Sequence, residues 1–164
     1  MSLRLIPAAV VTLLFSVSPV RAQIPNVVQW SGQLSTNSAA HPGQHSSLEI
    51  TAVIQDGWHV YALTQVAGGP MPLRIGIGHN PTVELDGKIT GSTPSKQHDP
   101  SFDLETQTYS HGFTVTAPLK VKRDAPAGNA SVPVSIRFQA CSDRTCLPPR
   151  TVQISVPLEV AAAK

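Results

Sequence analysis

The stretch SSLEITAVIQDGWHVYAL, residues 46–63, shows most clearly how this chain folds. Apolar residues recur at every second position from Leu48 to Ile54, which gives an extended strand one apolar face. The Asp56-Gly57 pair that follows is typical of a tight turn, and a second extended piece then begins. The stretch therefore predicts two strands joined by a turn, with one face of the first strand packed against a core.

The same two-residue period recurs along the rest of the chain, and no convincing helix pattern occurs after the amino-terminal segment. The segments are PLRIGI (72–77), TVELDGKI (82–89), GFTVTAPLKVK (112–122), ASVPVSIRFQAC (130–141) and RTVQISVPLEV (150–160). Turn signals separate these short strands at intervals of about ten residues. The pattern predicts an all-β fold, an antiparallel β-sandwich of the immunoglobulin-like kind.

Two polar stretches interrupt the strands. Residues 35–47 are small and polar, and residues 91–107 are polar apart from a lone aromatic, Phe102. Both stretches predict irregular loops, and long loops on a rigid sandwich often carry function.

The first residues of the chain have the layout of a secretory signal peptide. Arg4 precedes an apolar run, and Val20 and Ala22 stand at the −3 and −1 positions of a small-residue cleavage site. We therefore expect residues 1–22 to be cleaved and residues 23–164 to form a single exported domain.

Charge and hydropathy exclude two classes of partner. The chain has 12 Lys and Arg against 10 Asp and Glu, and two of the arginines lie in the predicted signal peptide. No basic stripe remains to bind nucleic acid. No second apolar run is long enough to cross a membrane, so we expect a soluble protein after cleavage.

The segment FQACSDRTCLPPR, residues 138–150, holds the only two cysteines, Cys141 and Cys146, separated by four residues. Alternation puts Cys141 on the strand face opposite to Ala140. A structural disulfide is one interpretation, although closing so short a ring stabilises a fold by only about 2 kcal/mol. Disulfides persist outside the cytosol, so the export signal fits this interpretation.

Two further interpretations of the cysteine pair are open. A zinc clip would need two more ligands, and His41 and His45 have suitable spacing, but nothing in the sequence links them to the cysteines. A redox pair would need a thiolate, which nearby cations stabilise. Arg144 inside the loop would help, and Asp143 beside it would oppose.

Three stretches together resemble the amino-terminal periplasmic domain of the DsbD thiol:disulfide interchange protein family. DGWHVYAL (56–63) is similar to the family's Gly-aromatic-x-x-Tyr strand. DPSFDLETQTY (99–109) is similar to its cap loop, and FQACSDRTCLPPRTVQISVPLEV (138–160) is similar to its active-site hairpin. Their order and distances together make a chance match improbable, and the likeness extends over most of residues 27–160.

The resemblance implies roles for particular residues. Cys141 and Cys146 would form the redox disulfide, with Cys146 making the mixed disulfide with partners. Phe102 would be the cap that shields the pair, and Tyr61 would line the site beneath it. His59 stands where some members carry a tyrosine, and it is either a titrating group near the thiols or an ordinary sheet-surface histidine.

One departure from the family concerns the acidic residues of the cap. Pro100 and Ser101 stand where acidic residues can precede the cap phenylalanine. The sequence leaves open whether Asp99 or Asp103 replaces them.

The resemblance also implies a function and partners. The domain would act in the periplasm as a monomeric protein-disulfide reductase component without metal or cofactor. It would relay two electrons from a thioredoxin-like domain of a DsbD-like membrane reductant to periplasmic thioredoxin-fold proteins, such as disulfide isomerases and cytochrome c maturation proteins. No membrane or thioredoxin-like domain follows, so we expect a stand-alone module. The alternative is a non-catalytic exported β-sandwich that binds a partner and has a structural disulfide.

Overall fold

The computed structural model describes residues 24–35 and 39–162, so the predicted signal peptide lies outside the described residues. Strands and connecting turns make up this part of the chain, and no helix occurs in it. The strands are β1 (Val28–Leu34), β2 (His45–Ile54), β3 (Trp58–Tyr61), β4 (Arg74–Ile77), β5 (Val83–Leu85), β6 (Thr90–Gly91), β7 (Ser95–Asp99), β8 (Leu104–Ser110), β9 (Gly112–Val121), β10 (Gly128–Phe138), β11 (Ala140–Ser142) and β12 (Arg150–Val160).

Two sheets form the body of the molecule. One has the order β1-β2-β9-β5, with β6 also paired to β9, and the other has the order β12-β10-β4. The strand ladders are antiparallel. The predicted all-β, immunoglobulin-like sandwich is therefore confirmed.

The core lies between these two sheets. Four of the residues that the alternation predicted to face inward have no exposed surface: Leu48 and Ile50 in β2, and Val134 and Ile136 in β10. The Trp30 ring of β1 lies 5.2 Å from the Phe138 ring of β10 and joins the two sheets. Burial of these apolar side chains supplies the main driving force for the fold.

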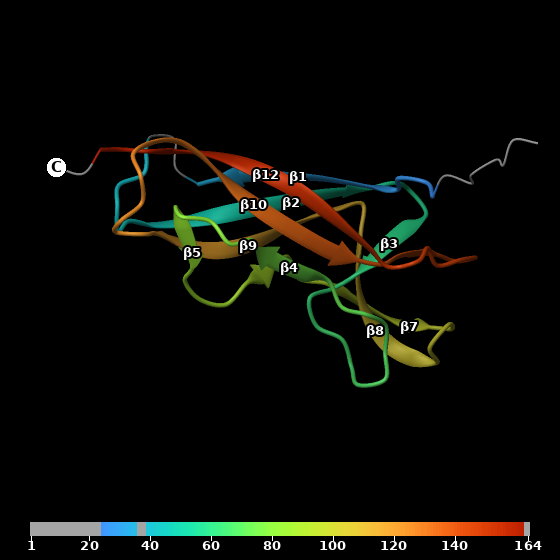
Figure 1. The fold of residues 1–164 in the computed structure, drawn as a ribbon. Coiled ribbons are helices and arrows are strands. Elements are labelled where there is room, and N and C mark those ends of the chain that lie inside the picture. The colour runs from blue at the N-terminus through green and yellow to red at the C-terminus, as the bar shows by residue number, and fades with distance from the viewer. Residues whose placement is uncertain (1–23, 36–38, 163–164) are drawn as a thin grey trace, which may run out of the picture.

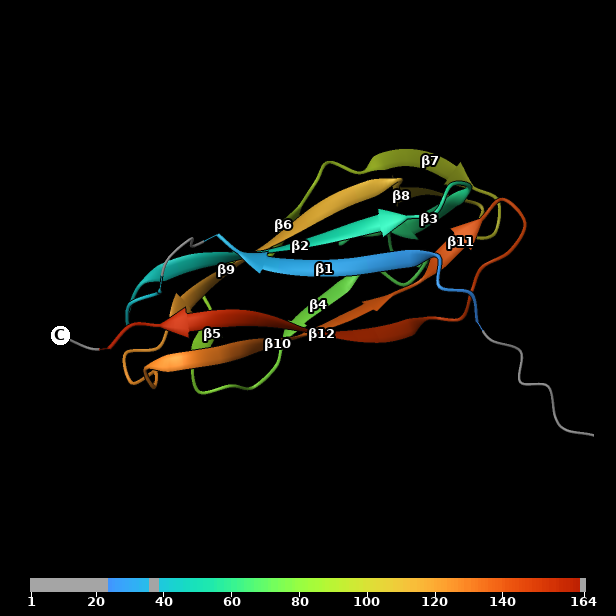
Figure 2. The ribbon, with the colours of Figure 1, turned by 90° about the horizontal axis from the view of Figure 1, so that it is seen from above.

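A third sheet, with the order β11-β3-β8-β7 and shorter strands, lies at one end of the sandwich (Figure 1, Figure 2). It is built from continuations of strands of both larger sheets. β3 follows β2 across the Asp56-Gly57 turn, β8 runs into β9 at His111, and β11 follows β10 after Gln139. This end therefore brings together segments that are far apart in the sequence.

The prediction of an irregular loop was wrong for much of residues 91–107, whereas the described part of residues 35–44 is irregular apart from one isolated bridge at Ala40. Within residues 91–107, β7 pairs with the first part of β8, and a turn at residues 100–103 joins them. The side chains of β7 are exposed as far as His98, because β7 is an edge strand, so its sequence has no apolar alternation. Within residues 35–47, β2 already begins at His45, and residues 36–38 lie outside the described part.

The two-sided character of the sheets can be tested with one substitution made at two places. Val115 in β9 is fully buried, whereas Val53 in β2 is 59% exposed. Val115→Thr should lower the free energy of unfolding by about 1–3 kcal/mol, because it buries a hydroxyl without a partner. Val53→Thr should change it by less than about 0.5 kcal/mol. Urea unfolding of the oxidised protein measures both, and equal losses would contradict the assigned faces.

Candidate functional site: the disulfide and its cavity

The two cysteines form a disulfide in a tight hairpin at the end of the molecule. Cys141 lies in β11, and Cys146 lies opposite it with a Cα–Cα distance of 4.0 Å. Two backbone hydrogen bonds close the hairpin. The Ser142 amide donates to the Thr145 carbonyl at 2.8 Å, and the Leu147 amide donates to the Ala140 carbonyl at 2.9 Å.

The two sulfur-bearing residues differ in exposure. Cys141 is only 1% exposed, whereas Cys146 is partly exposed. Ala140 packs in the hydrophobic core, and alternation places Cys141 on the other face of β11. That face of β11 lines a cavity and is not open surface. Cys141 therefore points away from the core, as predicted, but is still buried.

Strand β3 supplies the floor beside the disulfide. His59 is the direct cross-strand partner of Cys141 in the β3–β11 ladder. Tyr61 lies two residues further along and therefore on the same face. The rings of His59 and Tyr61 meet edge to face with centroids 5.5 Å apart. Two residues that the resemblance singled out are thus placed next to the buried cysteine.

The β7–β8 hairpin forms the cap over this floor. Asp99 at the end of β7 is 5% exposed, and it accepts a hydrogen bond from the Tyr61 hydroxyl at 2.7 Å. Its other carboxylate oxygen accepts from the Ser101 amide at 2.8 Å. The Phe102 ring meets the Tyr61 ring edge to face with centroids 6.1 Å apart. Tyr61 therefore anchors the cap to the floor through one polar and one aromatic contact.

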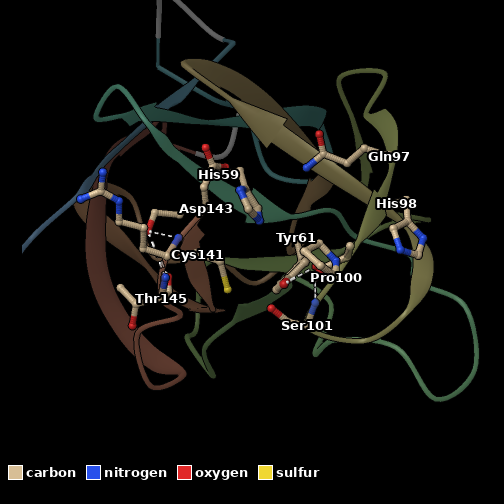
Figure 3. A pocket seen from close by; sticks show the side chains of 12 residues that line it. His59, Tyr61, Gln97, His98, Pro100, Ser101, Cys141, Asp143 and Thr145 are labelled. Atoms are coloured by element: carbon tan, nitrogen blue, oxygen red, sulfur yellow. Dashed lines mark hydrogen bonds between the residues drawn. The ribbon is translucent and has the colours of Figure 1, made fainter.

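A cavity of about 350 Å³ lies between the cap and the cysteine hairpin (Figure 3). Its walls come from β3, from the cap and from the hairpin, and they consist of His59, Tyr61, Gln97, His98, Asp99, Pro100, Ser101, Cys141, Ser142, Asp143, Arg144 and Thr145. Of the five predicted site residues, His59, Tyr61 and Cys141 line the cavity. The other two do not line the cavity: Phe102 packs on Tyr61, and Cys146 is bonded to Cys141.

Asp99 is the site residue that the sequence did not assign. Its burial and its bond to Tyr61 place a carboxylate inside the site. The only signal in the sequence was its position three residues before the cap phenylalanine, which did not distinguish it from Asp103. Asp103 is instead exposed and lies 3.5 Å from His98.

Burial decides the protonation of the two ring side chains. It lowers the pKa of His59, and the negative charges of Asp99 and Asp143 offset only part of this effect. Burial also raises the pKa of Tyr61, and the hydrogen bond to Asp99 raises it further. At neutral pH the neutral form of the His59 imidazole is therefore favoured. The Tyr61 hydroxyl stays protonated and donates its hydrogen bond to Asp99.

The described residues, 24–35 and 39–162, contain no group of three or more His, Cys, Asp or Glu side chains placed to hold a metal ion. Among these residues, no further ligands lie beside the cysteine pair to form the zinc site considered above. The same part of the chain includes no helix that is long and apolar enough to cross a membrane.

A family model described as “Thiol:disulfide interchange protein DsbD, N-terminal” matches residues 31–158, which include the floor, the cap and the cysteine hairpin. The chain belongs to this DsbD N-terminal family. The resemblance inferred from the three motifs is thus confirmed, and the bonded cysteine pair of such a domain identifies a thiol–disulfide exchange module.

Two solved structures are similar to this DsbD-type domain. The DsbD n-terminal domain of Neisseria meningitidis in the reduced form has 16% identity and a TM-score of 0.49, over 74% of this chain and 81% of that chain. The N-terminal periplasmic domain of ScsB from Proteus mirabilis has 16% identity and a TM-score of 0.48, over 81% of this chain and 45% of that chain. A search of curated proteins finds no match.

The anchoring of the cap predicts the effect of removing one hydroxyl. Tyr61→Phe keeps the ring but leaves one buried oxygen of Asp99 without its donor, so the free energy of unfolding should fall by about 1–3 kcal/mol. Amide hydrogen exchange in β7 and in the turn at residues 100–103 should become faster, because the cap loses its polar anchor.

Tyr109→Phe is the matched control for this prediction. Its hydroxyl donates to the Ser92 carbonyl at 3.0 Å, away from the cap turn. The control should leave exchange in that turn unchanged. Unchanged exchange in Tyr61→Phe would contradict the anchoring role.

Proposed function

We propose that this domain relays two electrons in the periplasm through the Cys141–Cys146 pair. The observation that carries the proposal is the placement of the disulfide. The disulfide joins the partly exposed Cys146 to the buried Cys141, and Cys141 borders the cavity beneath the cap hairpin. A bond that served only to fasten the chain would need neither the cavity nor the cap, whereas exchange needs room for an attacking group.

The difference in exposure between the two cysteines supports the following order of steps. A partner thiolate attacks the sulfur of Cys146, the Cys141–Cys146 bond breaks, and Cys141 leaves as a thiolate. The second cysteine of the partner then attacks, as a thiolate, the sulfur of the partner's first cysteine in the mixed disulfide. This attack releases Cys146 as a thiolate. The partner is oxidised to a disulfide, and this domain becomes a dithiol after taking up two protons. Reduction of a downstream partner runs through the same steps in reverse.

The proposed partners are proteins with the thioredoxin fold. A thioredoxin-like domain of a DsbD-like membrane reductant would supply the electrons, and disulfide isomerases or cytochrome c maturation proteins would accept them. The signal peptide predicted at residues 1–22 would export the chain. The domain would act as a monomer without a metal or cofactor, as a protein-disulfide reductase component.

Single-cysteine variants test the order of the steps. Cys141→Ala leaves Cys146 as the accessible thiol and removes the resolving group, so mixed disulfides with thioredoxin-fold proteins should accumulate. Non-reducing electrophoresis followed by mass spectrometry of periplasmic extracts measures them. Cys146→Ala is the control and should give far fewer adducts, because Cys141 is buried. If neither variant forms an adduct, the proposal of a relay is wrong.

A non-catalytic binding module with a structural disulfide is the second candidate, and the near-complete burial of Cys141 favours it. The reduction potential separates the two functions. Inert structural disulfides have potentials below about −300 mV, and a relay requires a higher value. We expect equilibration with a glutathione buffer, measured by thiol alkylation, to give a potential above that limit. A lower value would support the structural role.

A further inference from the structure

The group that lies opposite the buried cysteine in the ladder is a histidine. His59 and Cys141 are directly opposed in the β3–β11 ladder, and both side chains point into the cavity (Figure 3). Directly opposed side chains in an antiparallel ladder have Cβ atoms only about 5 Å apart. The imidazole and the Cys141 side chain are therefore neighbours in the wall of this cavity.

His59 has a ring nitrogen with unused hydrogen-bonding capacity at this place. Its Nε2 atom is buried and has no hydrogen-bond partner among the described residues. A buried polar atom without a partner costs about 1–3 kcal/mol, so its retention in the cavity wall calls for an explanation. A cysteine thiol on the facing strand would be such a partner, but the oxidised pair has no S–H proton to offer.

The other groups around the cavity are hydrogen-bonded or exposed to solvent. The Tyr61 hydroxyl donates to Asp99, and the two carboxylate oxygens of Asp99 accept from Tyr61 and from the Ser101 amide. Asp143 and Arg144 lie exposed on the hairpin turn. His98 lies on the exposed edge of the cap, 3.5 Å from Asp103. His59 is therefore the titratable group of the inner wall whose buried polar atom has no hydrogen-bond partner.

Exchange needs a proton acceptor at this point. To resolve a mixed disulfide on Cys146, Cys141 must act as a thiolate, and burial favours the neutral thiol instead. Bulk solvent is a poor acceptor for a thiol that is almost fully buried. A base held in the wall of the same cavity removes this obstacle.

We propose that His59 accepts the proton of Cys141 when Cys141 resolves a mixed disulfide, and returns it when Cys141 is released. The inference rests on the proposed relay function. In the resolving step the imidazole takes the proton from the Cys141 sulfur, and the resulting thiolate attacks the Cys146 sulfur. The Cys141–Cys146 bond forms, the bond from Cys146 to the partner breaks, and the partner leaves as a thiolate that takes the proton from the imidazolium or from water.

The surroundings of His59 suit both directions of this transfer. Burial lowers its pKa, so the imidazole is neutral and able to accept at pH 7. Asp99 from the cap and Asp143 from the hairpin face it with negative charge and stabilise the imidazolium once it has formed. The thiolate and the imidazolium also attract each other while they coexist.

The reaction of the reduced protein with glutathione disulfide separates the two steps. Cys146 first forms a glutathione adduct, and Cys141 then expels glutathione. Acid quenching and mass spectrometry follow both species over time. His59→Gln should form the adduct at the wild-type rate but resolve it at least about tenfold more slowly at pH 7. This minimum is lower than the rate enhancement that a general base typically gives.

The dependence of the resolution rate on pH is the decisive readout. In the wild type the rate should level off above the lowered pKa of His59. In His59→Gln it should keep rising past the pKa of an ordinary thiol, about 8.5, because burial favours the neutral form of the Cys141 thiol. His98→Gln is the matched control, because this second histidine borders the same cavity, and it should behave like the wild type.

Chemical rescue distinguishes proton transfer from packing. His59→Ala enlarges a cavity of about 350 Å³, so added imidazole can enter and should accelerate resolution in proportion to its concentration. Imidazole should not accelerate the wild type or His98→Ala.

The outcomes separate this inference from the relay itself. If reduced wild-type protein forms no adduct and no disulfide, the relay is wrong and the inference falls with it. If the wild type reacts but His59→Gln resolves the adduct within about twofold of it across pH 5–8, the role of His59 alone is overturned. A failure of imidazole to accelerate His59→Ala overturns that role as well.

Discussion

The site depends on one change of sheet. After Phe138 the chain leaves the β10–β12 sheet, passes Gln139 and enters the small end sheet as β11. In its new ladder Cys141 is opposite His59 instead of a residue of β12 or β4. If β10 simply continued in its own sheet, Cys141 would lie on the sandwich surface without a floor or a cap. The proximity of the disulfide to β3 therefore follows from the end of one strand ladder and the start of another.

The hydrogen bond between Tyr61 and Asp99 fixes the opposite wall. A buried carboxylate is costly unless donors satisfy its oxygens, and here a phenol and the Ser101 amide do so. The arrangement holds the cap in place and engages both groups, since Tyr61 donates its proton to Asp99 and each carboxylate oxygen of Asp99 accepts one hydrogen bond. His59 keeps an unengaged nitrogen between this pair and the disulfide. Structural and reactive roles are thus divided among three neighbouring side chains.

The sequence predicted those parts of the structure whose signals are local. The apolar alternation around Ile50 and Ile136 identified buried strands, because one face of each strand must enter the core. The cysteine hairpin and Phe102 could be recognised as motifs. The strand β7 could not, because an exposed edge strand has no apolar face. Nor could the pairing of His59 with Cys141, since the register between distant strands is set by the packing of whole sheets.

The unpartnered nitrogen of His59 also links the redox state of the pair to the stability of the cavity wall. In the disulfide form, Cys141 has no proton to donate, and the buried Nε2 atom of His59 has no hydrogen-bond partner, which is destabilising. Reduction places a thiol donor on the facing residue and can remove that cost. The proposed contact therefore favours the dithiol over the disulfide, in addition to its role in proton transfer. A tyrosine at this position, protonated at neutral pH and without a comparable acceptor nitrogen, would supply neither effect.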